Sequence, residues 1–438
     1  MLTLKPTSDF YSRALLEYDR VFSGDGAPRP FADLRRRGRD AFEALGIPTK
    51  RDEEWKHTDI RKAFPSDVSF FDPVALRITL DDVASHSIPG LDGRTIVVVN
   101  GVFEPSLSEL DGLGEIVITS LRASADAHPE LMQAHFGRYA EVGENSFVAL
   151  NSAFDLDGVF LYVPDGVIVE QPIRILHVID ADKEVIVQSR HLFVFGQNSQ
   201  ARVIETHHAR TGSVNSFGNH VTEIVVGRDA VIDHYRVEDE GDNAAQVNTT
   251  QVYQQDRSVF STTTFTFASG LVRNNVNVVV DGEHCESSLN GLYIARGDQH
   301  VDNRTLVDHA KPGCNSNELY KGIIYDRATG VFNGKVLVRR AAQQTNAYQQ
   351  SQGVVLSDDA DHYSKPELEI FADDVKCSHG STTGEIDLDA LFYCRTRGIS
   401  FEDARALLLY AFAHDVVKRV KLEPLRDWLN ARIDERLD

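Results

Sequence analysis

The stretch DGEHCESSLNGLYIA, residues 281–295, joins the two features that decide the fold: a turn-like segment around Gly282 and an extended run after it. Related segments, GRDAV, QDRSV and PGCNS, lie between residues 227 and 316, recur at intervals of about 27 to 31 residues, and each precedes an extended run. An irregular repeat of this size is typical of a chain that stacks successive coils. The sequence therefore predicts a β-solenoid.

Equivalent positions of successive coils lie above one another in a solenoid, so like residues should recur at the repeat distance. Cys285 and Cys314 are 29 residues apart, and each follows a glycine-containing turn. We interpret them as small buried residues in an internal stack rather than a redox pair. The amide-rich segment at 343–353 predicts a ladder of amide side chains. An antiparallel sandwich is the alternative fold, but it would favour tight two-residue hairpins, and few NG or DG turns separate the extended runs.

Helical patterns flank the extended runs on both sides, and three domains are expected: an N-terminal helical domain at 1–93, a β-strand region at 94–385 and a C-terminal helical domain at 386–438. Near the N-terminus, Thr49 with Asp52 three residues later predicts the cap of a short helix that presents Trp55 to a core.

The C-terminal domain should contain three helices. Gly398 fits the position just after the first helix, and Ser400 with Asp403 fits the cap of the second. The spacing of four apolar residues predicts a third, amphipathic helix: Leu425, Trp428, Leu429 and Ile433.

The charge of the chain argues against two classes of partner. Lys and Arg number 45 and Asp and Glu number 66, which gives a net charge of −21 and repels nucleic-acid phosphates and anionic lipid. The longest apolar run, ALLLYAFA at 406–413, is too short to cross a bilayer, and no signal-peptide pattern opens the sequence. Four cysteines without a CxxC motif fit a reducing compartment. We therefore expect a protein of the cytoplasm or of a plastid stroma.

The stretch FADDVKCSHGSTTG, residues 371–384, sets two acidic residues beside a cysteine and a histidine and is the strongest candidate for a functional site. In a strand after the acidic pair, Cys377 and His379 share one face and could contact the same metal ion or cluster. A closed site needs about four ligands, so this pair alone supports only a shared or transient centre.

Two other interpretations of this stretch compete. Asp373 and Asp374 could act as an acid/base pair in a carbohydrate-cleaving solenoid, but neighbouring strand residues point to opposite faces. A Cys–His nucleophile lacks a recognisable third group or oxyanion loop. A phosphate-binding loop is also missing from the sequence, so the chain is not expected to bind ATP. We interpret five other histidines as ordinary polar residues rather than ligands: His207, His208, His234, His284 and His309.

Several longer motifs together carry a resemblance to a known family. YKGIIYD, FNGKVLV, AQQTNAYQQSQGVVLS, KPELEIFADDVKCSHGSTTG and LFYCRTRGIS follow in order between about 315 and 412, and DEEWKHTDI lies near the N-terminus. This combination resembles the SufB/SufD family of iron-sulfur cluster assembly scaffolds. SufB-type chains carry a cysteine where this chain has Ser351 and a glutamate where it has Gly380. The resemblance is therefore strongest to the SufD type.

The resemblance implies a mainly β fold: a right-handed parallel β-helix, or solenoid, flanked by N-terminal and C-terminal α-helical domains. It implies a non-catalytic scaffold subunit of a SufBCD-type complex, which pairs with SufB and docks the ABC-type ATPase SufC, where the ATPase activity resides. The alternatives are a SufB-like sister subunit and, from a different class, a free-standing β-solenoid enzyme acting on carbohydrate. A homodimer is the alternative state of the isolated chain.

The resemblance also implies roles for individual residues. His379 matches the family histidine at the interface with SufB, where it would be a metal ligand shared with the partner chain, and Cys377 lies beside it. The cluster would be transient at that interface, with none stably bound by the isolated chain. Contact with the ATPase would involve the C-terminal helices, with these residues: Tyr393, Arg397, Gly398, Ile399 and Leu407.

Overall fold

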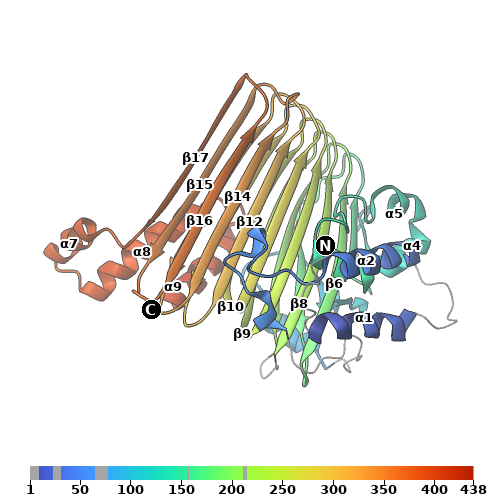
Figure 1. Ribbon diagram of the computed structural model, residues 1–438, viewed down its shortest axis with the longest axis horizontal. Helices are drawn as coiled ribbons and strands as arrows, with labels where there is room; N and C mark the ends of the chain where they lie inside the picture. Colours follow the sequence, from blue (N-terminus) through green and yellow to red (C-terminus); the bar gives the residue numbers. More distant parts are fainter. Residues whose placement is uncertain (1–8, 23–30, 65–76, 155–156, 211–214, 438) are drawn as a thin grey trace.

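The computed structural model describes residues 9–22, 31–64, 77–154, 157–210 and 215–437. Its core is a β-solenoid of about eight turns, with helices at both ends (Figure 1). This confirms the predicted fold class. Among the described residues, no helix combines the length and apolar composition needed to span a bilayer.

Two facing layers of strands form the solenoid, and within each layer the successive coils pair in parallel. β9 (Val231–Gln254) and β10 (Val259–Val280) are long enough to run through both layers. The remaining strands of one layer are β1 (Arg94–Val99), β5 (Ile173–Ile179), β7 (Gln200–Ala209), β11 (Glu286–Ala295), β13 (Asn315–Ile324), β15 (Thr345–Val355) and β17 (Val375–Gly384). Those of the other are β4 (Val159–Val163), β6 (Val185–Phe195), β8 (Ser216–Val226), β12 (His300–His309), β14 (Thr329–Val338) and β16 (Asp361–Ile370). Two short strands pair antiparallel with the first coil: β2 (Val102–Phe103) and β3 (Val117–Ser120).

The turn segments that reveal the repeat share one backbone conformation. Asp229, Arg257, His284 and Gly313 all have a left-handed φ, between 53° and 73°. The N–H of each of these residues donates to a carbonyl of the next coil, as Arg257 does to Glu283 at 2.8 Å. The repeat in the sequence is therefore the repeat of one turn geometry per coil.

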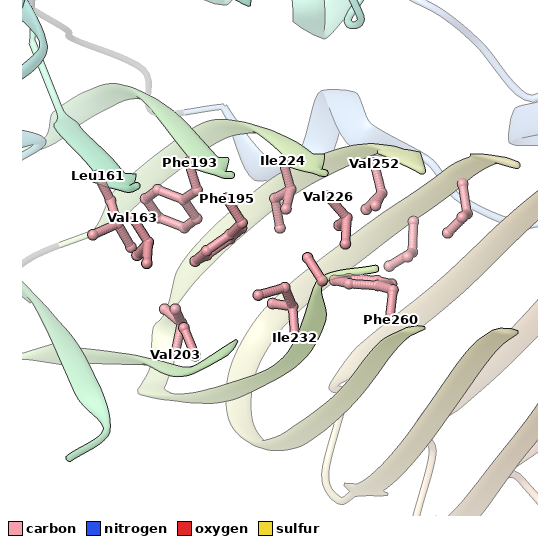
Figure 2. Packing of buried hydrophobic residues seen from close by; sticks show 14 of the residues in the cluster. Leu161, Val163, Phe193, Phe195, Val203, Ile224, Val226, Ile232, Val252 and Phe260 are labelled. Atoms are coloured by element: carbon pink, nitrogen blue, oxygen red, sulfur yellow. The ribbon is translucent and has the colours of Figure 1, made fainter. Parts of the chain in front are cut away.

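Apolar side chains fill the part of the interior next to these turns. Leu161, Phe193, Ile224 and Val252 occupy paired positions on four successive coils, and Figure 2 shows them in a row facing Ile232 and other residues of the opposite layer. Farther along the solenoid, Cys285 and Cys314 are fully buried in the same cluster, and the Cys285 N–H donates to Cys314 Sγ at 3.4 Å. The predicted internal cysteine stack is confirmed. The amide ladder is partly confirmed, since Asn346 donates to Asn315 at 2.9 Å.

The N-terminal helices cover the first coils. α1 (Asp9–Phe22) and α2 (Ala32–Leu45) pack near α6 (Ser146–Ala153). Trp55 is buried, as predicted, with the Arg273 guanidinium 3.6 Å from its ring centroid. Further short helices are α3 (Leu80–Ser85), α4 (Leu121–Ala127), α5 (Pro129–His135) and the 3₁₀ turns η1 (Glu53–Trp55), η2 (Ile60–Ala63) and η3 (Pro105–Leu107).

The predicted Thr49 cap is wrong. The helix that follows is the single 3₁₀ turn η1, and Asp52 is the residue that precedes it. The Asp52 carboxylate instead accepts from the N–H and hydroxyl of Thr49, at 2.7 and 3.1 Å, so the pair closes a turn before the helix. Three residues are too few to develop the α-helical turn that such a cap would satisfy.

The C-terminal helices are α7 (Leu388–Thr396), α8 (Phe401–Val417) and α9 (Glu423–Leu437). Gly398 has a left-handed φ of 87°, and Ser400 accepts from the Asp403 N–H at 3.0 Å, so both predicted caps are confirmed. Leu425, Leu429 and Ile433 are fully buried, which confirms the third helix. α8 and α9 pack on the solenoid, whereas α7 projects away from it (Figure 1).

Candidate functional site

The solenoid ends in an open coil made by β16 and β17. β16 pairs with β14 and β17 pairs with β15, and no other strand of the described ranges covers their outer edges. An uncovered edge strand presents backbone N–H and C=O groups that can pair with another chain. The last coil is therefore the part of the solenoid whose backbone groups can pair with another chain.

Cys377 and His379 lie on β17, in register with Ala347 and Gln349 of β15. Cys377 is half-buried against the apolar cluster that contains Val338, and burial raises the pKa of its thiol. His379 is exposed, and its side chain forms no hydrogen bond or ion pair with the described residues. The same face therefore holds a packed thiol and a free imidazole.

The exposure of His379 follows from its place at the end of a stack. Glu318, Gln349 and His379 occupy paired positions on three successive coils. Glu318 and Gln349 are buried, and the Gln349 amide donates to Glu318 at 3.2 Å. Burial raises the pKa of Glu318 to about 7. His379 reaches solvent because no further coil of the described residues covers it.

Apolar side chains surround this open end. Ile370 and Phe371 are exposed at the end of β16, and Tyr348 is exposed on β15. Asp373 and Asp374 lie in the turn between β16 and β17, where the Asp374 N–H donates to Gln343. Exposed apolar residues beside an uncovered strand edge favour contact with another protein chain.

A second apolar surface lies on the projecting helix α7 and the first part of α8, and we call it the α7–α8 patch. The Arg397 guanidinium lies 4.9 Å from the centroid of the Tyr393 ring, and Gly398 makes the left-handed turn between the helices. Of the residues expected to dock an ATPase, Tyr393, Arg397, Gly398 and Leu407 are exposed and Ile399 is half-buried. The large apolar side chains of the patch are Leu388, Phe392, Tyr393, Phe401 and Leu407.

Sequence reasoning missed three members of this patch: Leu388, Phe392 and Phe401. The consecutive apolar residues of LFY, at 391–393, were the available signal. In a helix they point in different directions, so they exceed what one buried face needs.

A third group of reactive side chains lies inside the first coils and was also missed. His207, interpreted from sequence as an ordinary polar residue, lies with His177, His220, Glu205 and Glu240 in two overlapping groups that could hold a metal ion. All five residues are buried. Burial lowers the pKa of His207 and His220, and burial raises the pKa of Glu240 to about 8. The spacing of 30 residues between His177 and His207 matches the coil repeat and was the available signal.

Comparison with known proteins gives the family of this chain. Residues 177–412 match the SUF system FeS cluster assembly, SufBD core domain, and residues 15–175 match the SufBD protein N-terminal region. An iron-sulfur cluster assembly SufBD family protein of Synechocystis is 32% identical over 88% of this chain and 87% of that protein.

Two similar relatives carry the name iron-sulfur cluster assembly protein SufD. The Escherichia coli protein is 28% identical over 97% of both chains, and the Bacillus subtilis protein is 26% identical over 74% of both. These relatives agree with the resemblance to the SufD type, and they favour a scaffold over a carbohydrate enzyme. The chain belongs to the SufB/SufD family of iron-sulfur cluster assembly proteins.

Proposed function

We propose that this chain is the SufD-type scaffold subunit of a SufBCD-type complex, and that it pairs with a SufB-type chain through the open coil of β16 and β17. One observation carries the proposal: His379 is exposed without a hydrogen bond or ion pair from the described residues, on the uncovered last strand. An imidazole in that position can give one nitrogen ligand to a cluster that forms at the interface.

The cluster is cargo of the complex rather than a resident group of this chain. A cluster site needs about four ligands, and this end of the chain offers His379 and the half-buried Cys377. Burial raises the pKa of the Cys377 thiol, which disfavours the thiolate, the form that binds iron. The remaining ligands must therefore come from the partner chain, and the cluster is transient.

The α7–α8 patch provides the surface for a SufC-type ATPase. Its five large apolar side chains are exposed, three of them on α7, which projects away from the solenoid (Figure 1), and two in the first part of α8. Fully exposed aromatic side chains are unfavourable in an isolated chain and favourable in the core of an interface. ATP hydrolysis then belongs to the partner, because this sequence has no phosphate-binding loop.

Co-expression with the SufB-type and SufC-type chains of the same organism tests the proposal. The three chains should purify together, and anaerobic reconstitution should yield iron and acid-labile sulfide in the complex and not in this chain alone. A cluster held stoichiometrically by the isolated chain through gel filtration would contradict the shared site.

A pair of matched variants tests the interface. Phe371 and Ile168 are both 60% exposed, but Phe371 lies beside the open coil and Ile168 lies at the opposite end of the solenoid. Phe371→Asp places a charge in the proposed apolar contact, so recovery of the SufB-type chain should fall about tenfold or more. Ile168→Asp should leave recovery unchanged. Equal recovery with both variants would place the interface elsewhere.

A further inference from the structure

Three side chains converge inside the first coils, far from the open coil. His207 lies on β7, His220 on β8 and Glu240 on β9, so both layers of the solenoid contribute. Their exposed fractions are 0%, 3% and 7%. One potential ligand atom from each lies within 4.8 Å of the other two.

These side chains carry polar atoms that have no hydrogen-bond partner in the described part of the chain. The four atoms without a partner are the two ring nitrogens of His207, Nε2 of His220 and Oε1 of Glu240. His207 Nδ1 lies 4.0 Å from Glu240 Oε1. A buried polar atom without a partner destabilises the folded chain. Four such atoms in one place are therefore expected to have a ligand.

Neighbouring residues fix the other polar atom of two of these side chains. The Gln246 amide donates to Glu240 Oε2 at 2.9 Å, and the Ser189 hydroxyl lies 2.5 Å from His220 Nδ1. Metal-binding histidines and carboxylates are commonly oriented by such second hydrogen bonds. These hydrogen bonds hold Glu240 and His220 in place, while Oε1 of Glu240 and Nε2 of His220 have no hydrogen-bond partner among the described residues.

The neighbouring group of His177, Glu205 and His207 is different. The Glu205 carboxylate already contacts His234 at 2.7 Å, His177 at 3.3 Å and Arg236 at 3.5 Å. A metal ion would have to displace these contacts. Glu205 is therefore a satisfied buried carboxylate, and it is an unsuitable ligand.

The charges around His207 favour a cation. Glu205, Glu238 and Glu240 are buried there, and the guanidinium of Arg236 contacts two of them. Arg236 balances one of the two carboxylates that it contacts, so a negative charge remains even while Glu240, whose pKa burial raises to about 8, is protonated. Buried charges are tolerated when they are paired or bind a metal.

We propose that His207, His220 and Glu240 bind one divalent first-row transition-metal cation. Two imidazoles and one carboxylate suit Zn²⁺, Fe²⁺ and Co²⁺, whereas Mg²⁺ and Ca²⁺ prefer oxygen ligands. Donor atoms about 2.0–2.2 Å from an ion lie roughly 3–3.5 Å apart, so small side-chain rotations close the site. Because the three residues are buried, the ion enters as the chain folds. The site is independent of His379 and of the proposed interface.

Expression of the full chain in cobalt-supplemented medium tests the site, since Co²⁺ replaces Zn²⁺ or Fe²⁺ and has visible absorption bands. After removal of loosely bound metal, the wild-type protein should retain about one Co²⁺ per chain, with the spectrum of a nitrogen- and oxygen-ligated ion. Mg²⁺ and Ca²⁺ should not be retained. A wild-type protein without bound Co²⁺ would overturn the proposal, whatever the behaviour of any variant.

Four variants locate the ion. Glu240→Gln preserves the shape of the side chain, and it should lower the retained Co²⁺ about tenfold or more, as should His207→Gln. His177→Gln, from the neighbouring group, and His379→Ala, at the open coil, should each retain the ion. Loss of Co²⁺ in either of these two, with retention in Glu240→Gln, would overturn the assignment. Circular dichroism checks that each variant folds.

Discussion

His207 and His379 lie in the same layer of the solenoid, yet their surroundings differ completely. His207 on β7 has a paired strand on each side and is fully buried, whereas His379 on β17 is exposed and, among the described residues, has a paired strand on one side only. The first histidine can serve only a ligand that is enclosed as the chain folds. The second can serve a ligand shared with another chain. Position in the stack of coils, rather than residue type, decides which kind of ligand each histidine can reach.

The largest effect is expected where a charge pair is enclosed in the first coils. Arg190 and Glu223 are both fully buried with a 2.9 Å contact, and Glu223 also accepts from the N–H groups of Gly137, Tyr139 and Ala140. Arg190→Ala leaves a buried carboxylate without its cation, so the free energy of unfolding should fall by about 3–5 kcal/mol in denaturant titrations. The double variant with Glu223→Leu should be less destabilised than Arg190→Ala alone. If Arg190→Ala unfolds like wild type, the first coils are not enclosed as described.

A smaller effect on the free energy of unfolding is expected at Glu318, which lies on β13 between the coil of His207 and the coil of His379. Its pKa is raised by burial from 4.5 to about 7, so its stabilising contribution is complete below pH 4.5 and is lost as pH rises through 7. Glu318→Gln stays neutral at every pH. The free energy of unfolding of the variant, relative to that of wild type, should rise by on the order of 3 kcal/mol between pH 4.5 and pH 8. Denaturant unfolding at each pH measures this difference. A difference that does not change with pH would show that Glu318 is solvated.

The sequence predicts the features that depend on local chemistry. The coil repeat is visible because each turn needs a left-handed residue such as Asp229 or Arg257, and the Ser400 cap is visible because it involves Asp403 nearby. α6 was missed because nearly all of its side chains are buried, so it lacks the polar face that marks a surface helix.

The sites depend on contacts that the sequence does not show locally. His207, His220 and Glu240 come from three strands, and only the register of the coils brings them together. Alternation along β17 places Cys377 and His379 on one face, but the exposure of His379 depends on the absence of a covering coil within the described ranges. Their proposed roles remain predictions.

The α7–α8 patch offers a third environment, on α7, which projects from the solenoid, and on the exposed start of α8. Arg397 lies over the Tyr393 ring at the exposed tip. Arg397→Glu reverses one charge within the proposed contact, so the dissociation constant for the SufC-type ATPase should rise about tenfold in a calorimetric titration. Arg340→Glu, in the turn after β14, is the matched exposed control. Unchanged affinity of the Arg397 variant would move the docking surface elsewhere.

The smallest effect is expected at Cys377, the half-buried neighbour of His379. Its thiol packs against apolar side chains, so it should contribute to packing more than to the cluster. Cys377→Ala in the assembled complex should lower the rate of cluster formation less than about twofold. A loss as large as that of the His379 variant would make Cys377 a ligand and remove the distinction between the two residues.

The most direct test of the account is the rate of cluster formation in the assembled complex with His379→Ala. The variant removes one exposed ring, so the complex should purify intact, while anaerobic iron and sulfide incorporation should fall about tenfold or more. Ser378→Ala, an exposed residue on the opposite face of the same strand, should behave like wild type. If the His379→Ala complex assembles and forms clusters at the normal rate, the open end of the solenoid is a structural terminus and the proposed site is wrong.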